Sequence, residues 1–100
     1  MAKFARLWID DVREAPEGWL HAHSTFEAID ILKNNDVKYI SLDHDAGDFE
    51  PDGGDFINVL DWIEQAGGGE KYIFTIHSMN PVGRSNMIRV IEHNHWKLLH

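Results

Sequence analysis

The amino-acid sequence predicts an α/β fold, a mostly parallel five-stranded sheet flanked by about three helices. The alternation of two sequence patterns supports this prediction. Short apolar runs alternate along the chain with segments whose apolar residues recur at helical spacing. Strands that alternate with helices in this way pair in parallel through right-handed crossovers. A length of 100 residues suits one core, so we expect residues 1–100 to form a single domain.

The first two strands are predicted near the N-terminus. Residues 4–9 are largely apolar and stop at Asp10 and Asp11, a pattern typical of a strand that is buried on both faces. The residues that follow include proline and glycine, which predicts a loop. Residues 19–23 alternate mildly between apolar and polar types and predict a short second strand.

Ser24 and Glu27 begin the first predicted helix. Their spacing is that of a capping box, in which the serine side chain accepts a hydrogen bond from a helical amide. Apolar residues follow at helical spacing until Asn34 and Asn35 end the pattern. Residues 38–42 form an apolar run that again stops at acidic residues, and this run predicts the third strand.

The alternation continues in the second half of the chain. The second predicted helix is marked by four apolar residues at positions i, i+3, i+4 and i+7, which are Phe56, Val59, Leu60 and Ile63. Glycines at residues 67–69 end this helix. Residues 72–76 are again apolar and predict the fourth strand.

The third predicted helix follows Asn80 and Pro81. The asparagine is a good capping residue, proline is favoured at the first helical position, and the helix reaches about Ile91. Residues 96–99 then predict the last strand. Three tryptophans are expected to pack in the core: Trp8, Trp62 and Trp96.

The composition excludes several classes of protein. With 43% hydrophobic and 26% charged residues the chain can form a packed globule, and it has no apolar run of membrane-spanning length. No signal peptide is evident, so we expect a cytoplasmic protein with no membrane partner. The net charge of −8 argues against binding of duplex nucleic acid, which relies on clusters of lysine and arginine. Because cysteine is absent, function must rest on oxygen and nitrogen ligands.

Acidic residues follow two of the predicted strands. Asp10 and Asp11 end the first strand, and Asp43 and Asp45 end the third. In open parallel sheets, ligands bind beyond the carboxyl ends of the strands. Hard cations prefer carboxylate oxygens, and clustered carboxylates repel one another without a counter-ion. We therefore expect Asp10, Asp11 and Asp43 to bind Mg²⁺ or Mn²⁺; the alternative is that these aspartates cap turns or lie in solvent.

Three further residues at the same edge are candidates for catalysis together with Asp43. His44 and His77 follow different strands, and an imidazole can accept or donate a proton near neutral pH. A structural role is the alternative for each histidine. Ser78 can donate a hydrogen bond to a phosphoryl oxygen, and its alternative role is to form the turn before the third helix.

The start of the third helix is a candidate phosphate site. Its first amides and its partial positive charge can face an anion, and Arg84 can bind a phosphate through two nitrogens. We expect Asn80, Gly83 and Arg84 to contribute, with Ser78 beside them. Asn-Pro is also an ordinary helix start, so this signal has a purely structural alternative.

Taken together, these motifs resemble the cyclic-phosphate-processing receiver-like domain family, a compact relative of the response-regulator receiver domain. The resemblance covers nearly the whole chain. It is carried by residues 7–13 (LWIDDVR), Gly18 with Trp19, residues 41–47 (SLDHDAG), Gly53 and Gly54 with Trp62, and residues 77–83 (HSMNPVG) with Met87. The resemblance implies a compact receiver-like, flavodoxin-like sheet.

The resemblance also implies roles for particular residues. Asp10, Asp11 and Asp43 correspond to the acidic metal pocket of receivers, with Asp43 at the phosphoacceptor position and Ser78 at the hydroxyl position. Additional motif residues of the family are matched by Arg13, His44 and His77.

The chain departs from receiver domains in two respects. The segment between the first two strands is too short for the usual first helix. Receivers also use a lysine at the end of the last strand to contact the phosphoryl group; Lys97 lies in the last predicted strand, but no Lys-Pro motif follows it. These departures argue against phosphotransfer and leave Arg13, Arg84 or His77 to supply positive charge to a phosphate.

Three functions are therefore open. The leading hypothesis is a metal-dependent phosphoesterase that processes a cyclic phosphate, with a cyclic nucleotide as one candidate substrate. The alternatives are a noncatalytic module that binds a phosphate ligand or a protein, and a receiver-type signalling domain that accepts phosphate on Asp43. The expected partner is a small phosphorylated ligand, and the oligomeric state is left open.

Overall fold

The computed structural model describes residues 4–99, which form five strands and three α-helices. The strands are β1 (Ala5–Ile9), β2 (Leu20–Ala22), β3 (Val37–Leu42), β4 (Ile73–Ile76) and β5 (Lys97–Leu99). The helices are α1 (Thr25–Asn34), α2 (Ile57–Ala66) and α3 (Pro81–His93), with short 3₁₀ turns η1 (Gly47–Phe49) and η2 (Gly69–Lys71). Each predicted strand and helix is present, with ends that differ from the prediction by one or two residues.

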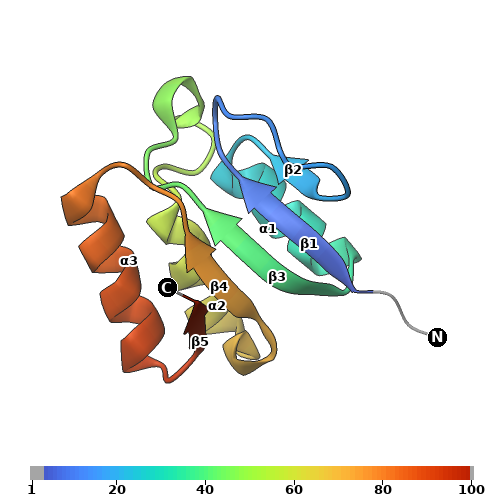
Figure 1. The fold of residues 1–100 in the computed structure, drawn as a ribbon, viewed down its shortest axis with the longest axis vertical. Coiled ribbons are helices and arrows are strands. Elements are labelled where there is room, and N and C mark those ends of the chain that lie inside the picture. Colours follow the sequence, from blue (N-terminus) through green and yellow to red (C-terminus); the bar gives the residue numbers. More distant parts are fainter. Residues whose placement is uncertain (1–3, 100) are drawn as a thin grey trace.

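All five strands run parallel, in the order β2-β1-β3-β4-β5 (Figure 1). This order confirms the predicted α/β fold and makes the sheet wholly parallel. The carboxyl ends of β1, β3 and β4 therefore lie next to one another at one edge of the sheet. Residues that follow these strands in the sequence are brought together at that edge, although they lie far apart along the chain.

Local sequence signals set the helix ends. The Ser24 side chain accepts a hydrogen bond from the Glu27 amide at 3.1 Å, as the capping box predicts. In a capping box the Glu27 carboxylate would accept from the amide of Ser24. Here it accepts from the amide of the preceding residue, His23. At the start of α3, the Asn80 side chain accepts from the amides of Val82 and Gly83.

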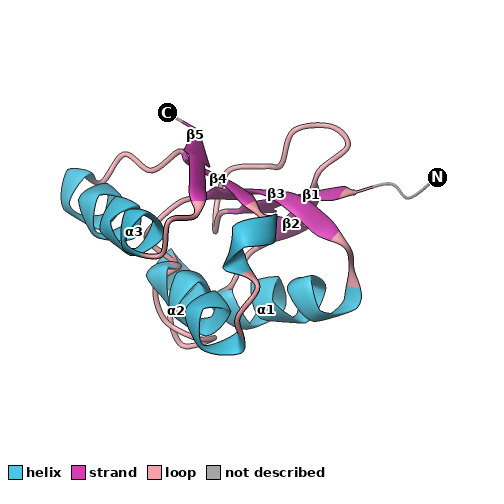
Figure 2. Cartoon of the chain, turned by 90° about the horizontal axis from the view of Figure 1, so that it is seen from below, coloured by secondary structure: helices cyan, strands magenta, loops and turns pink. Residues whose placement is uncertain are grey.

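The core lies between the sheet and its helices. Leu7, Ile40 and Phe74 are in register on neighbouring strands and are all fully buried. Their side chains pack with buried residues of all three helices, among them Leu60 and Met87. Figure 2 shows the three helices on the same side of the sheet, while the opposite side carries no helix.

The single helical layer corrects two expectations. The prediction that the first strand is buried on both faces is wrong, because Arg6 is exposed and Trp8 is only half-buried on the side away from the helices. The prediction that Trp8 packs in the core is wrong for the same reason. Trp62 and Trp96 do pack against the core, as predicted. Sequence reasoning failed here because an apolar strand of five residues does not reveal whether one helical layer or two will cover it.

Candidate functional site

Three aspartates form a cluster at the carboxyl ends of β1 and β3. A carboxylate oxygen from each of Asp10, Asp11 and Asp43 lies within 4.8 Å of the other two. Asp10 is buried, and the other two side chains are half-buried. The sequence placed these residues at one edge of the sheet, and the structure brings them into one group that can hold a cation.

Asp10 is held by hydrogen bonds on both carboxylate oxygens. Its Oδ1 accepts from the amides of Val12 and Arg13, both at 2.9 Å, and its Oδ2 lies 2.9 Å from Nε2 of His77. Burial disfavours the charged form, but these hydrogen bonds and the nearby imidazole outweigh it and lower the pKa of Asp10. Asp10 therefore remains ionised at neutral pH, in a fixed orientation.

Asp11 is in the opposite electrostatic situation. Burial raises its pKa, and the negative charges of Asp10 and Asp43 raise it further, although its own backbone amide works against the shift. Gly47 in η1 closes over this side chain, because a Cβ at Gly47 would overlap the Asp11 carboxylate. The cluster thus concentrates negative charge that a bound cation would neutralise.

His77 lies against the sheet face that has no helix. Its ring stacks on Trp8 with a centroid distance of 3.8 Å, and its Nδ1 is 2.8 Å from the hydroxyl of Ser41. Because ionised Asp10 can only accept, Nε2 of His77 donates to it and Nδ1 accepts from Ser41. Burial lowers the pKa of His77 and favours this neutral form, even though Asp10 opposes the shift.

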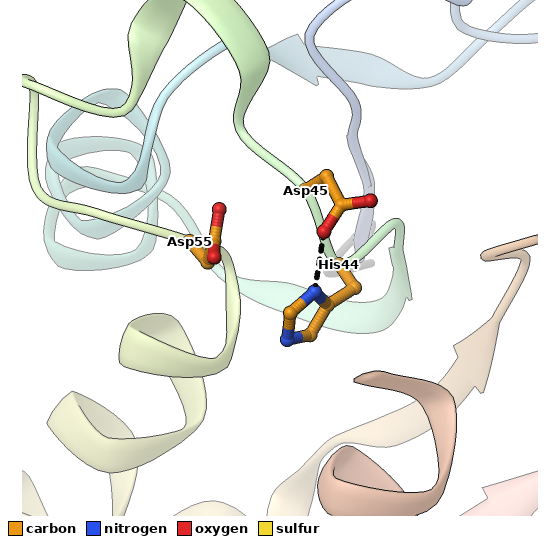
Figure 3. Close-up of side chains that lie close together, drawn as sticks. All are labelled: His44, Asp45 and Asp55. Atoms are coloured by element: carbon orange, nitrogen blue, oxygen red, sulfur yellow. Dashed lines mark hydrogen bonds and ion pairs between the residues drawn. The ribbon is translucent and has the colours of Figure 1, made fainter. Parts of the chain in front are cut away.

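His44 joins a different group from His77. Its Nδ1 is 2.7 Å from Oδ1 of Asp45, and its ring packs against Gly83 of α3. The hydrogen bond from His44 lowers the pKa of Asp45. Figure 3 shows Asp55 facing this pair, and the three side chains form a second group of potential ligands within 4.8 Å. The acidic residues predicted at the end of β3 are therefore divided between two clusters.

The first amides of α3 already donate hydrogen bonds to side chains at the start of the helix. The amides of Val82 and Gly83 donate to the Asn80 side chain, and the Asn80 amide donates to Oγ of Ser78. The Asn80 side chain also donates to Asp45. Asn80 and Gly83 thus have clear structural roles, and their predicted role in phosphate binding stays a prediction.

The two candidate arginines differ in their surroundings. Arg13 is exposed and close enough to His77 to disfavour its protonated form. Arg84 is half-buried and donates to the backbone carbonyl of Ile76 at the end of β4. Arg13 is therefore the freer of these two guanidinium groups to approach a phosphate beside the aspartates.

Sequence reasoning missed several residues that shape the site. Ser41 lies inside β3 and is nearly fully buried, so a lone serine in an apolar run gave no sign of its bond to His77. Gly47 closes over Asp11, and Asp55 accepts from the Ala46 amide beside His44. The motif of residues 41–47 includes both Ser41 and Gly47, but the resemblance gave neither residue a role.

A model of the cyclic-phosphate processing receiver domain matches residues 5–93 of this chain. The chain belongs to this family. The match spans β1 to the end of α3 and so includes every residue of the acidic cluster and of the His77 network. It confirms the resemblance found in the motifs. Comparisons with curated proteins and with solved structures gave no significant match.

None of the described helices is long and apolar enough to cross a membrane.

Proposed function

We propose that this receiver-type domain hydrolyses a cyclic phosphate with a divalent cation held by Asp10, Asp11 and Asp43. The observation that carries the proposal is the convergence of these three carboxylates within 4.8 Å, beside His77, at the carboxyl edge of the sheet. Membership of the cyclic-phosphate processing family supports the substrate class. Either Mg²⁺ or Mn²⁺ suits an all-carboxylate site.

The residues present fit such a cation. Every ligand in the cluster is a carboxylate, and the pKa of Asp11 is raised by burial and by the charges of Asp10 and Asp43, which a cation would offset. When bound, the cation would polarise phosphoryl oxygens and lower the pKa of a bound water.

The chain's own side chains would bind and orient the phosphate. Oγ of Ser78 already accepts from the Asn80 amide, so its hydroxyl hydrogen is left to donate to a phosphoryl oxygen. The exposed guanidinium of Arg13 would supply positive charge. During hydrolysis the water oxygen bonds to phosphorus, one P–O bond of the ring breaks, and the proton lost by water ends on the leaving oxygen.

His77 acts as a positioning residue in this proposal. Its two ring nitrogens are occupied by Asp10 and Ser41, so it fixes the Asp10 carboxylate rather than facing an incoming phosphate. His44 lies with Asp45 on the side of α3, and its role in proton transfer is a prediction.

Phosphorus NMR tests the proposal directly. The protein would be incubated with Mg²⁺ or Mn²⁺ and a pooled set of 2′,3′- and 3′,5′-cyclic nucleotides. We expect a phosphate monoester resonance with the wild type and none with Asp43→Asn. Asp36→Asn is the matched control, because Asp36 is an exposed aspartate at the opposite end of β3. Equal turnover by Asp43→Asn and Asp36→Asn would show that the activity lies elsewhere or comes from a contaminant.

The phosphoacceptor alternative is tested by labelling with acetyl phosphate. Lys97 pairs with Ile73, the first residue of β4, and so lies about 10 Å from the carboxyl edge. Its ammonium is therefore poorly placed to contact a phosphoryl group on Asp43, which supports hydrolysis over phosphotransfer. A base-labile adduct lost in Asp43→Asn, without turnover of cyclic nucleotides, would reverse this ranking. Ligand binding without product or adduct would support the noncatalytic alternative.

A further inference from the structure

One face of the sheet has no helical cover over β3, β4 and β5 (Figure 2). Two rows of residues in register across the strands point to this side, opposite the buried core residues. We call the uncovered part the open face, and its residues are Arg6, Tyr39, Ile73, Thr75, Lys97 and Leu99. All of them are exposed or half-buried.

The topology explains why this face is uncovered. Right-handed crossovers that run in opposite directions across a sheet lie on opposite faces. The β1–β2 connection runs opposite to the three later crossovers, and it is a loop that contacts Trp8 through Trp19 and the carbonyl of Arg13. His77 stacks on Trp8 and hydrogen-bonds to buried Ser41, and no helix within residues 4–99 covers the other residues on this side (Figure 2). Parallel sheets are normally covered on both faces.

The two charged residues of the open face, Arg6 and Lys97, are both positive. The charged residues within the five strands are Arg6, Lys38 and Lys97, and no strand contains an aspartate or glutamate. Subtracting these three positive charges from the net charge of −8 leaves −11 for the rest of the chain. The open face is thus a basic area on a strongly acidic protein, and it favours an acidic partner.

Apolar groups lie between these charges. Leu99 is 56% exposed, and Ile73 and Tyr39 are half-buried. The guanidinium of Arg6 lies 5.8 Å from the centre of the Tyr39 ring, and the ammonium of Lys38 lies 5.7 Å from it. The two cations partly cover the ring while keeping their charges available at its margin.

We propose that an acidic amphipathic helix of a partner protein binds the open face. Three strands at the usual spacing span about 10 Å, which is close to the diameter of one helix with its side chains. Apolar residues of the partner helix would pack on Tyr39, Ile73 and Leu99, and its glutamates or aspartates would face Arg6 and Lys97. The bound helix would supply the second helical layer that parallel sheets normally have.

A designed peptide provides the test. The probe is a helical peptide with leucine at i, i+3, i+4 and i+7 and glutamate on the flanking positions, added to ¹⁵N-labelled protein. We expect amide shifts concentrated in β3, β4 and β5. We also expect Lys97→Glu to weaken binding at least about fivefold. Arg89→Glu is the matched control, because Arg89 is an exposed cation on α3 and its reversal changes the net charge by the same amount.

Several outcomes would overturn the proposal. These are no binding at millimolar peptide, equal weakening by Lys97→Glu and Arg89→Glu, or shifts confined to the acidic cluster. Tighter binding of a single-stranded oligouridylate than of the peptide would point to a nucleic acid instead. Self-association in sedimentation that Lys97→Glu abolishes would point to a second copy of this chain. If circular dichroism shows that Lys97→Glu is unfolded, Arg6→Glu replaces it. Arg6 lies on the other side of the open face, and its reversal should also weaken peptide binding.

Discussion

At the scale of single residues, the acidic cluster shows how neighbouring groups set the state of a carboxylate. Asp10 and Asp11 are adjacent in the sequence, but the pKa of the first is lowered and that of the second is raised. The difference arises from hydrogen bonds: Asp10 receives three from Val12, Arg13 and His77, while Asp11 faces two negative charges. In the proposed cation site, Asp10 would be a fixed ligand and Asp11 the ligand whose charge a cation neutralises most favourably.

Asp11→Asn is expected to stabilise the protein when no divalent cation is present. The substitution removes a charge that burial and two neighbouring carboxylates disfavour. In EDTA the free energy of unfolding should therefore rise by about 1 kcal/mol, and the melting temperature by a few degrees. The same variant should lose the stabilisation that Mg²⁺ gives the wild type. Thermal unfolding with and without Mg²⁺ measures both effects. A lower melting temperature in EDTA would show that Asp11 has a favourable structural role.

The neutral state of His77 predicts a pH dependence of stability. Its folded pKa lies below the unfolded value of 6.5, so the folded protein binds a proton less readily than the unfolded chain. The stability from neutral His77 is complete above pH 6.5 and is lost as the pH falls from there through the lowered pKa. Urea unfolding of wild type and His77→Gln in EDTA, over a pH series, should show a steeper acid-side loss for the wild type. Parallel curves for the two proteins would contradict this assignment.

At the scale of elements, the contact between α3 and the segment that follows β3 depends on the absence of a side chain at Gly83. A Cβ on this residue would overlap the His44 ring, so the helix approaches the end of β3 more closely than any other residue would permit. Beside this contact, Nδ1 of His44 lies 2.7 Å from Oδ1 of Asp45. The position of the His44 ring is therefore tied to the packing of α3.

The effect of Gly83→Ala on stability should depend on whether the His44 ring is present. An alanine within a helix normally stabilises it by about 1 kcal/mol relative to glycine. Here the overlap with the imidazole should reverse the sign and destabilise the protein by about 1–2 kcal/mol. In a His44→Ala background the same substitution should be stabilising. Denaturant unfolding of the four proteins in this double-mutant cycle gives the coupling energy, and a coupling near zero would mean that α3 moves freely to make room.

At the scale of the whole molecule, the domain is a sheet with helices on one side only. Neighbouring residues on a central strand therefore lie in different environments: Phe74 is fully buried beneath the helices, and Thr75 is half-buried on the open face. The stacked rings of Trp8 and His77 lie on the side that has no helix (Figure 2).

Substitutions at these two positions test the one-sided architecture. Phe74→Ala should lower the free energy of unfolding by about 3–5 kcal/mol, a large part of the stability of a domain of this size. Thr75→Ala should change it by less than about 1 kcal/mol. Urea unfolding of the two variants provides the comparison. A loss at Thr75 as large as that at Phe74 would show that the open face is covered in solution.

The sequence by itself determined the elements and the edge at which the functional groups gather. Apolar runs that stop at Asp10 and Asp43, the Ser24 cap and the Asn80-Pro81 start are local signals, and local backbone and side-chain chemistry decides them. Strand alternation with helices then determined the parallel sheet, since right-handed crossovers leave few other arrangements.

Only the tertiary structure decided how the groups at that edge are paired. His77 meets both Asp10 and the hydroxyl of Ser41 inside β3, while His44 packs against Gly83 of α3. Whether β1 is covered on one face or two depends on a crossover that forms a loop instead of a helix. These outcomes rest on contacts between segments distant in the chain, and packing in three dimensions decides them because no local pattern encodes which side chains will share a space.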